Sequence, residues 1–395
     1  VVQVWISEAK KFTPDIRVTK LSGTPDVRRQ ILLDSDNWDV LVTNYAIVRN
    51  DIDQIHMVKF DSIILDEAQQ IKNPQAQVTV CIKSIDAENR IALTGTPLEN
   101  RLLDLWSIVD FLLPQFLGDE QDFLARYDGS RFGRERLAKR IAPLMLRRTK
   151  DAVAPELPPR SEEVVILPMS EKQQSVYNGY LSEARRVAQS KGTMAVLAAL
   201  TRLRQICCHP QLVTDPEKDG MKQLDSAKLD CLLGMIEELT SEGHSALIFS
   251  QFVGMLDIIE EEMKKRKQSY FKIIGQTSTD KRQKQVDAFN KCKDPSVFLL
   301  SLRAAGTGLT LTKADYVFIF DPWWNPAVEN QAIDRTHRIG QDKPVMAYRL
   351  VMAGSVEEKV LAMQDEKRQL FEEMIEGTEQ MPTGLTAQDL IALLD

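Results

Sequence analysis

The sequence is poor in cysteine, and its cysteines lack the spacing of a metal site. The five cysteines form no CxxC pair, and the adjacent Cys207 and Cys208, followed by His209, have no second ligand cluster nearby. Neither a zinc site nor a disulfide framework is therefore predicted. We expect plain thiols in a reducing compartment.

Long apolar runs are also missing. No stretch approaches the ~18 to 20 apolar residues that cross a bilayer, and the first residues carry no basic region like that of a signal peptide. We therefore expect no membrane contact. Apolar residues make up 43% and charged residues 27% of the 395 positions, which excludes wholesale disorder and a collagen-like fibre. A chain of this length predicts two or three cores at roughly 150 residues per domain.

An excess of basic residues is absent as well. Fifty Lys and Arg against 57 Asp and Glu give a net charge of −7, unlike many small DNA-binding domains. The charge is unevenly distributed, because residues 131–150 hold eight basic side chains and one Glu, and residues 357–395 are strongly acidic. A polyanion could bind the basic run, although a merely solvated face has the same composition.

Apolar runs and helical patterns alternate along much of the chain. Strands are predicted in the runs 39–49, 60–66 and 90–94, and again at 245–250, 270–275, 297–301 and 316–320, with helices such as 228–239 and 252–265. This alternation indicates two α/β units with parallel sheets. The stretch between them has long helical patterns at 171–189 and 194–206. We therefore predict a first lobe at 1–99, helical protrusions and a linker at 100–225, a second lobe at 226–355, and an acidic helical tail at 356–395.

Two acidic residues follow a predicted buried strand. Asp66 and Glu67 end the run IILDEAQ, and ligands of open α/β sheets bind beyond the carboxyl ends of strands. Asp66 is therefore a candidate Mg²⁺ ligand, and Glu67 is a candidate for polarising an attacking water. A strand that ends in a simple acidic turn gives the same pattern.

Two further strand ends lead into loops of small residues. Thr94, Gly95 and Thr96 follow one predicted strand, where hydroxyl groups beside a metal site could sense the state of a phosphate. Gly306 and Gly308 follow another, where the backbone can approach a phosphate closely. Each pattern alone is also compatible with an ordinary turn.

The segment QAIDRTHRIGQ carries two arginines three residues apart. A helix there would place Gln331, Asp334 or Arg335, and Arg338 on one face. Two converging guanidinium groups can hold phosphate oxygens and stabilise transition-state charge. The alternative is a solvated, salt-bridged helix.

Several longer segments together resemble one family. They are DEAQQIKNP (66–74), LTGTPLENRLLDLWSIVDFLLPQFLG (93–118), PLMLRRTKDAVAPELPPR (143–160), LRQICCHPQL (203–212) and FDPWWNP joined to DRTHRIGQ within 320–341. In this order they resemble the Swi/Snf (sucrose-non-fermenting) type of ATPase, the double-stranded-DNA translocase branch of helicase superfamily two. The resemblance covers essentially the whole chain.

The resemblance implies a role for each matching residue. Two RecA-like lobes would bind ATP and Mg²⁺ between Asp66 and Glu67 on one side and the arginine fingers on the other. Gln331 and Asp334 would lie beside those fingers and help to bind the nucleotide. Gln69 stands where many members have histidine. The family's basic inter-lobe segment corresponds to Arg147, Arg148 and Lys150, which would contact DNA. Its DPWWNP segment corresponds to Trp323 and Trp324, of which we expect one in the core and the other at the cleft or on DNA.

One departure from the family pattern is clear. No G-x-x-x-x-G-K-[ST] segment occurs in these 395 residues, so the loop that cradles the β- and γ-phosphates is not present. We expect an N-terminally truncated motor that lacks this loop. The alternative is a natural relative that binds DNA without turnover. A strand-separating helicase is a further alternative.

The resemblance also implies partners and a location. The partners would be double-stranded DNA, contacted through its phosphates, and DNA-bound proteins displaced by the motor. The location would be the bacterial cytoplasm with the nucleoid, or the nucleus of a eukaryote.

Overall fold

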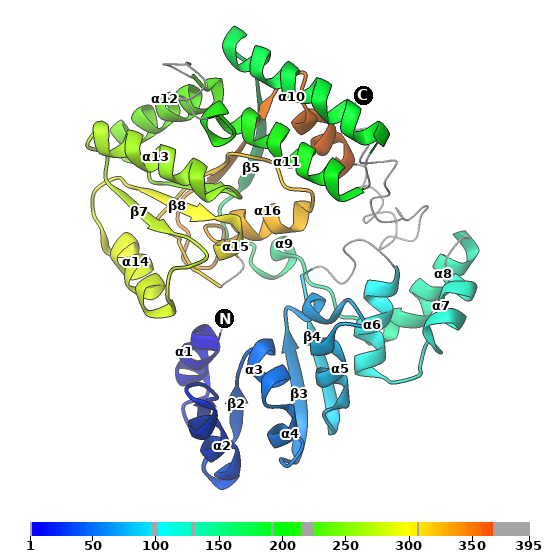
Figure 1. Ribbon diagram of the computed structural model, residues 1–395. Coiled ribbons are helices and arrows are strands. Elements are labelled where there is room, and N and C mark those ends of the chain that lie inside the picture. The colour runs from blue at the N-terminus through cyan, green and yellow to red at the C-terminus, as the bar shows by residue number, and fades with distance from the viewer. Residues whose placement is uncertain are drawn as a thin grey trace. The chain divides into compact units, whose positions relative to one another are not determined.

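The computed structural model describes residues 2–95, 102–127, 131–190, 193–214, 225–305 and 308–365. The chain folds into two compact units, and the division falls between Leu146 and Arg147. Each unit combines helices with parallel strands, as Figure 1 shows. The predicted α/β class is confirmed.

The first unit contains two pairs of parallel strands. β1 pairs with β2, and β3 pairs with β4 in a register that sets Asp66 opposite Leu93. The strands are β1 (Val18–Lys20), β2 (Val40–Val42), β3 (Phe60–Asp66) and β4 (Ala87–Leu93). The helices are α1 (Val2–Phe12), α2 (Pro25–Leu33), α3 (Tyr45–Asn50), α4 (Ile52–Ile55), α5 (Gln77–Ser84), α6 (Leu102–Leu112), α7 (Glu120–Tyr127) and α8 (Arg131–Ile141).

The predicted strand at residues 39–49 is only partly correct. Its first part forms β2, but α3 begins at Tyr45. The change occurs because the side chain of Asn44 accepts a hydrogen bond of 3.0 Å from the backbone amide of Ile47 and so caps the helix. The apolar, β-branched pattern of this run therefore did not reveal the helix that begins at Tyr45, because that start depends on the capping side chain of Asn44.

The second unit is built on one sheet of six parallel strands. Their order across the sheet is β5-β10-β9-β6-β8-β7. The strands are β5 (Arg160–Leu167), β6 (Ala246–Ser250), β7 (Tyr270–Ile273), β8 (Val297–Ser301), β9 (Tyr316–Ile319) and β10 (Val345–Met352). The helices are α9 (Lys150–Val153), α10 (Glu171–Ser190), α11 (Thr193–Cys208), α12 (Ala227–Ser241), α13 (Val253–Lys265), α14 (Thr279–Lys291), α15 (Leu302–Ala305) and α16 (Pro326–Ile333). Residues 356–365 are also helical.

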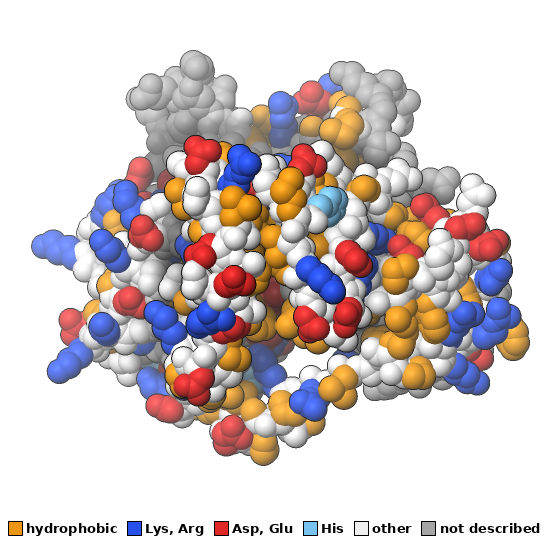
Figure 2. Space-filling model, turned by 90° about the horizontal axis from the view of Figure 1, so that it is seen from below, with side chains coloured by type: hydrophobic (Ala, Val, Ile, Leu, Met, Phe, Trp, Pro, Cys, Tyr) orange, Lys and Arg blue, Asp and Glu red, His pale blue; other side chains and the backbone are white. Residues whose placement is uncertain are grey.

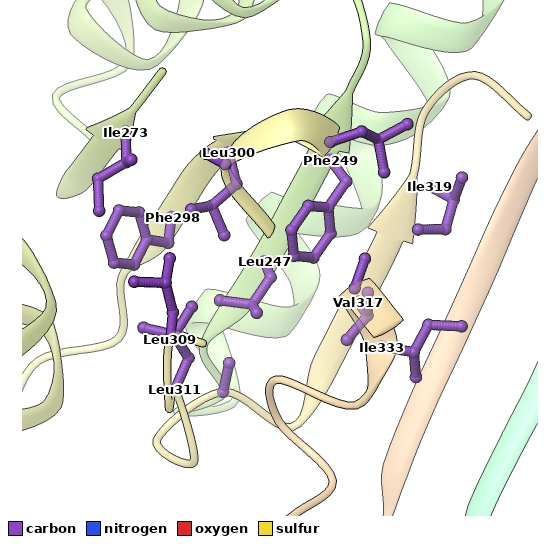
Figure 3. Close-up of a cluster of buried hydrophobic side chains, with 14 of the residues drawn as sticks. Leu247, Phe249, Ile273, Phe298, Leu300, Leu309, Leu311, Val317, Ile319 and Ile333 are labelled. Atoms are coloured by element: carbon purple, nitrogen blue, oxygen red, sulfur yellow. The ribbon is translucent and has the colours of Figure 1, made fainter. Parts of the chain in front are cut away.

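Helices cover both faces of this sheet. In β6, Leu247 and Phe249 pack with α14, α15 and α16, and Figure 3 shows this cluster. Ala246 and Ile248, which alternate with them, pack with α12 and α13 on the other face. Because both faces are buried, β6 and β8 are continuous apolar runs, as the sequence predicted. Each fully buried Leu or Phe in such a core contributes about 1.5–3 kcal/mol.

The region predicted as a helical insertion, residues 100–225, is divided between the two units. Helices α6 to α8 belong to the first unit, and the chain from Arg147 onward belongs to the second. The reason is that β5 pairs with β10 along all of its residues, from Arg160 to Leu167. The segment predicted as linker thus supplies the edge strand of the second sheet, and α10 and α11 pack with Met352 at the end of β10.

Candidate functional site

The acidic pair lies at the carboxyl end of β3. Asp66 is the last residue of this strand, and its Oδ1 accepts a hydrogen bond of 3.0 Å from the amide of Glu67. Glu67 itself has a left-handed backbone, with φ 53° and ψ 52°. This conformation costs a non-glycine residue about 1–2 kcal/mol, and such strain concentrates at functional sites.

A chain of side-chain hydrogen bonds joins Glu67 to Thr94. Gln69 Nε2 donates to Glu67 Oε2 over 2.6 Å, and Thr94 Oγ1 donates to Gln69 Oε1 over 2.8 Å. Thr94 directly follows β4, which is the parallel neighbour of β3. The structure therefore brings the acidic pair and the first residue of the Thr-Gly-Thr loop together, with Gln69 as the bridge.

Two aromatic residues that the sequence did not single out contact Asp66. Trp5 Nε1 donates to Asp66 Oδ2 over 2.8 Å, and the Tyr45 hydroxyl donates to the Asp66 carbonyl oxygen over 2.8 Å. Burial raises the pKa of Tyr45, and the negative charges of Asp66 and Glu67 raise it further. Trp5 lies 61 residues from its partner, so no local pattern could have found it.

These residues fit a magnesium ion. Burial is the main cause of the raised pKa of Tyr45, and the negative charges of Asp66 and Glu67 add to it, so two carboxylates lie close together here. Mg²⁺ is usually held by one or two carboxylates together with phosphates and water. Among the described residues, no cluster of three or more His, Cys, Asp or Glu side chains could hold a metal ion. A magnesium ion held at Asp66 would therefore take its remaining oxygen ligands from water or from a bound phosphate.

The glycines and the second threonine of the predicted loops are only partly described. Thr96 and Gly306 lie outside the described residues. Gly308 has φ 74°, a left-handed backbone that strongly favours glycine. Among the described residues, an added Cβ at Gly95 would meet no atom within 4 Å, so their packing does not require glycine there.

The arginine segment of the second unit is not a continuous helix. Helix α16 ends at Ile333, so the condition for a common helical face of Gln331, Asp334 or Arg335, and Arg338 is not met. Past this point the backbone amides of Arg335 and Thr336 bond carbonyls three residues back, and the Thr336 hydroxyl also donates to the Ile333 carbonyl over 2.8 Å. The His337 ring, 2.8 Å from the Pro158 carbonyl oxygen, also draws the chain away from the helix axis.

Both arginines nevertheless lie against the loop that follows Gly308. The amide of Leu311 donates to the Arg335 carbonyl over 2.9 Å, and Arg335 is only 4% exposed. The Arg338 guanidinium is 3.3 Å from Thr310 Oγ1 and 3.0 Å from the Asp334 carbonyl oxygen. Two motifs that the sequence treated separately are therefore adjacent in the second unit.

Lys150 and Asp334, predicted to contact DNA and nucleotide respectively, bind each other. Lys150 Nζ lies 2.6 Å from Asp334 Oδ1 and donates to the His337 carbonyl over 2.9 Å. Arg160 Nη1 also contacts Asp334 Oδ1, at 3.0 Å. The Asp334 carboxylate thus pairs with two cations of its own chain.

The two adjacent tryptophans share one partner. Trp323 packs on the α14–α16 face of the sheet and Trp324 packs with α10 and α11, and both are half-buried. The Arg204 guanidinium lies 5.6 Å from the Trp323 ring and 5.1 Å from the Trp324 ring. Both rings therefore lie near the same buried arginine, and which of the two tryptophans would meet DNA stays a prediction.

Much of the basic run 131–150 is engaged within the chain. Arg140 donates to the Phe116 carbonyl over 2.7 Å, and the Arg136 guanidinium lies 5.6 Å from the Tyr127 ring. Arg147 and Arg148 are exposed. On the face shown in Figure 2, basic and acidic side chains are interspersed and form no large field of one sign.

Comparison with known proteins gives first the class and then the family. Residues 227–340 match the helicase conserved C-terminal domain, which places the chain in the helicase class. Residues 1–212 match the SNF2-related domain. The chain belongs to the SNF2 family.

Relatives are found in bacteria and in eukaryotes. A Mycoplasma genitalium protein named an uncharacterized ATP-dependent helicase is 34% identical over 99% of this chain and 38% of its own length. The mouse SWI/SNF-related matrix-associated actin-dependent regulator of chromatin subfamily A member 1 is 35% identical over 93% of this chain and 37% of its own length. The chain thus spans well under half of these relatives.

A solved structure is also similar. The Sulfolobus solfataricus SWI2/SNF2 ATPase core in complex with dsDNA has 33% sequence identity, with a TM-score of 0.48 over 94% of this chain and 80% of that one.

Among the described residues, no helix is both long and apolar enough to span a bilayer.

Proposed function

We propose that this chain supplies catalytic residues for ATP hydrolysis that drives movement along double-stranded DNA. The observation that carries the proposal is the hydrogen-bonded chain from Glu67 through Gln69 to Thr94, because it links a strained acid to a loop suited to sensing phosphate. Membership of the SNF2 family supports it. So do the names of relatives, which include an ATP-dependent helicase and the yeast ISWI chromatin-remodeling complex ATPase ISW1.

Each unit would contribute its own residues to the reaction. Asp66 would hold Mg²⁺, which when bound neutralises charge on the nucleotide phosphates. Glu67, kept in place by Gln69, would orient and polarise the attacking water. Arg335 and Arg338 would stabilise the charge that develops on the transferred phosphoryl group.

The phosphate-binding loop is not among these residues, which contain no G-x-x-x-x-G-K-[ST]. We therefore propose that the 395-residue chain by itself hydrolyses ATP at no appreciable rate. The measurement is phosphate release by the purified chain with and without duplex DNA. A DNA-stimulated rate that disappears in Glu67→Gln would contradict this part of the proposal.

The DNA contacts would be made to phosphates. Exposed Arg147 and Arg148 are the proposed contributors, and the half-buried Trp323 and Trp324 would contribute at most through their exposed edges. Phosphate contacts carry no base information, so affinity should fall with salt and should not depend on sequence. Proteins bound to the same duplex would be displaced as the motor moves, in the nucleoid of a bacterium or the nucleus of a eukaryote.

The decisive experiment compares two outcomes on one preparation of the full-length protein that carries this chain. With ATP, it should release a triplex-forming third strand from duplex DNA and leave the duplex itself intact, because separating strands also requires about 1.4 kcal/mol per base-pair step. Duplex DNA should stimulate ATP hydrolysis more than single-stranded DNA or RNA. Efficient unwinding without third-strand release would favour a strand-separating helicase, and DNA binding without hydrolysis would favour a scaffold.

A further inference from the structure

A chain of alternating charges crosses the second unit. It begins with the Lys150–Asp334 pair and continues through Arg160, which contacts both Asp334 and Glu162. These residues come from α9, from the turn after α16 and from β5. The chain therefore connects the first residues of the second unit with the segment that carries Arg335.

The same chain continues into the core. Arg349 of β10 contacts Glu162 at 2.6 Å and Glu329 of α16 at 2.8 Å. Glu329 Oε1 in turn accepts a hydrogen bond of 2.6 Å from the amide of Trp323. Burial would raise the pKa of Glu162, but Arg160 and Arg349 outweigh it and the pKa is lowered. The six charged residues comprise three cations and three anions, so the chain is neutral as a whole.

The two ends of this chain differ in burial. The side chains of Glu329 and Arg349 are 0% and 5% exposed, so each needs the other to offset its lost hydration. The side chains of Lys150 and Asp334 are 40% and 32% exposed. An ion pair this accessible is worth at most about 1 kcal/mol and is easily broken. Lys150–Asp334 is therefore the breakable end of an otherwise fixed network.

The Lys150–Asp334 pair connects the exposed basic segment with the turn that carries the two arginines. Lys150 lies two residues after the exposed Arg148 and begins α9, close to the point where the chain enters the second unit. Its ammonium group contacts the turn at two places, the Asp334 carboxylate and the His337 carbonyl. These two contacts flank Arg335 in sequence and precede Arg338.

We propose that Lys150 is a positioning residue that fixes the turn 334–338 and links it to the segment carrying Arg147 and Arg148. Its pairing holds the arginine turn in one arrangement, and displacement of the 147–150 segment releases it. The link to DNA-stimulated hydrolysis rests on the proposed function above. The positioning itself does not, so the two can be tested apart.

The first test measures backbone hydrogen exchange by mass spectrometry on the 395-residue chain. The amides of Asp334, Arg335 and Gln341 are hydrogen-bonded within or next to the turn and report its opening. Lys150→Met should accelerate exchange in a peptide covering 334–341 at least threefold and leave α12 unchanged. Lys150→Arg, which keeps both contacts possible, should restore slow exchange.

The control is Lys265→Met, which removes an exposed pair with Glu262 on α13. This variant should leave the 334–341 peptide unchanged. Equal exchange in wild type and Lys150→Met would overturn the positioning role. So would an acceleration spread evenly over the whole second unit, because that pattern is general destabilisation.

The second test uses the full-length protein that carries this chain. The ratio of DNA-stimulated to basal ATP turnover should fall at least fivefold in Lys150→Met and recover in Lys150→Arg. A ratio that stays at the wild-type level would overturn the link to DNA. A wild-type protein without any DNA-stimulated turnover would instead refute the proposed function, and the exchange result would stand independently.

Discussion

The hydroxyl of Thr94 donates a hydrogen bond of 2.8 Å to Gln69, which joins the ends of two neighbouring strands through one side chain. The amide of Gln69 has a donor and an acceptor, and it uses the donor for Glu67 and the acceptor for Thr94. A side chain that bridges Glu67 and Thr94 therefore needs one hydrogen-bond donor and one acceptor, each within reach of its partner.

Substitutions of Gln69 should show whether this hydrogen-bonded bridge matters for ATP turnover. In the full-length protein that carries this chain, Gln69→Ala should lower kcat by roughly tenfold or more, because a hydrogen bond to a charged group contributes about 1.5–3 kcal/mol. Gln69→His should retain most of the activity, since an imidazole ring also offers one donor and one acceptor. Steady-state ATPase assays decide the matter, and equal loss in both variants would contradict the bridging role.

Replacing either arginine of the turn should lower turnover equally, but the two replacements should differ in their effect on protein stability. Arg338→Ala and Arg335→Ala should each lower kcat by roughly 10³ and leave ATP affinity within several-fold. Because Arg335 is 4% exposed, its removal should also lower Tm, whereas the more accessible Arg338 should be replaceable with little change in Tm. Near-normal turnover in Arg338→Ala would assign this residue to structure alone.

The exposed pair Arg147 and Arg148 should determine part of the salt dependence of DNA binding. Replacing both with Ala should reduce the slope of log K against log salt by about 2, since each phosphate contact contributes roughly 0.9. Fluorescence anisotropy with a labelled duplex measures this slope. The control replaces Lys264 and Lys265 with Ala, which removes the same charge from α13. Identical slopes in the two variants would indicate a general charge effect.

Replacing one member of the buried pair Lys228–Glu357 should lower the free energy of unfolding much more than replacing both members together. Both side chains are 0% exposed, and Lys228 Nζ also donates to the Phe320 carbonyl over 2.9 Å. Lys228→Met should therefore lower the free energy of unfolding by about 3–5 kcal/mol. Adding Glu357→Gln should recover much of this loss, because the amide oxygen can still accept the hydrogen bond of 3.0 Å that the Met352 backbone amide donates to Glu357. Denaturant titration measures both, and a double variant no more stable than Lys228→Met would contradict the argument.

Asp321 should make the second unit less stable as pH rises from about 4 to 6. Burial raises the pKa of its carboxyl to about 6, although Arg204, Ser250 and Lys228 oppose the shift. Between the unfolded and folded pKa values the native state binds more protons, so the free energy of unfolding decreases with rising pH. The decrease is on the order of 3 kcal/mol.

The matched variant for this prediction is Asp321→Asn. The unfolding free energy of wild type minus that of Asp321→Asn should decrease as pH rises across this range, in denaturant titrations at several pH values. His209 acts in the opposite direction, since burial lowers its pKa to about 4, but it is common to both proteins and cancels. A difference independent of pH would sink the prediction.

The sequence predicted those parts of the fold whose signal is local. β6 and β8 are buried on both faces and were found as continuous apolar runs. β5 was missed because it is an edge strand, whose exposed positions include Glu162 and Glu163 and whose partner β10 lies far along the chain. An edge strand with charged residues has no unbroken apolar run to reveal it.

The candidate site follows the same rule. Asp66 and Thr94 could be expected near each other because consecutive parallel strands end at one edge of a sheet. The Lys150–Asp334 contact spans 184 residues and joins two positions that the sequence assigned to different ligands. Only the folded chain shows that these two charges satisfy each other.

The place of β10 between β5 and β9 limits how this chain can be dissected. The match to the helicase C-terminal domain ends at residue 340, before β10 begins at Val345. A fragment cut there would leave β5 without a neighbour and open two strand edges to aggregation. Gln364 donates to Glu329 over 2.8 Å, so a soluble recombinant second unit should begin before α9 and extend past residue 364. Cloning boundaries for this protein are set by its sheet, and motif boundaries would cut through it.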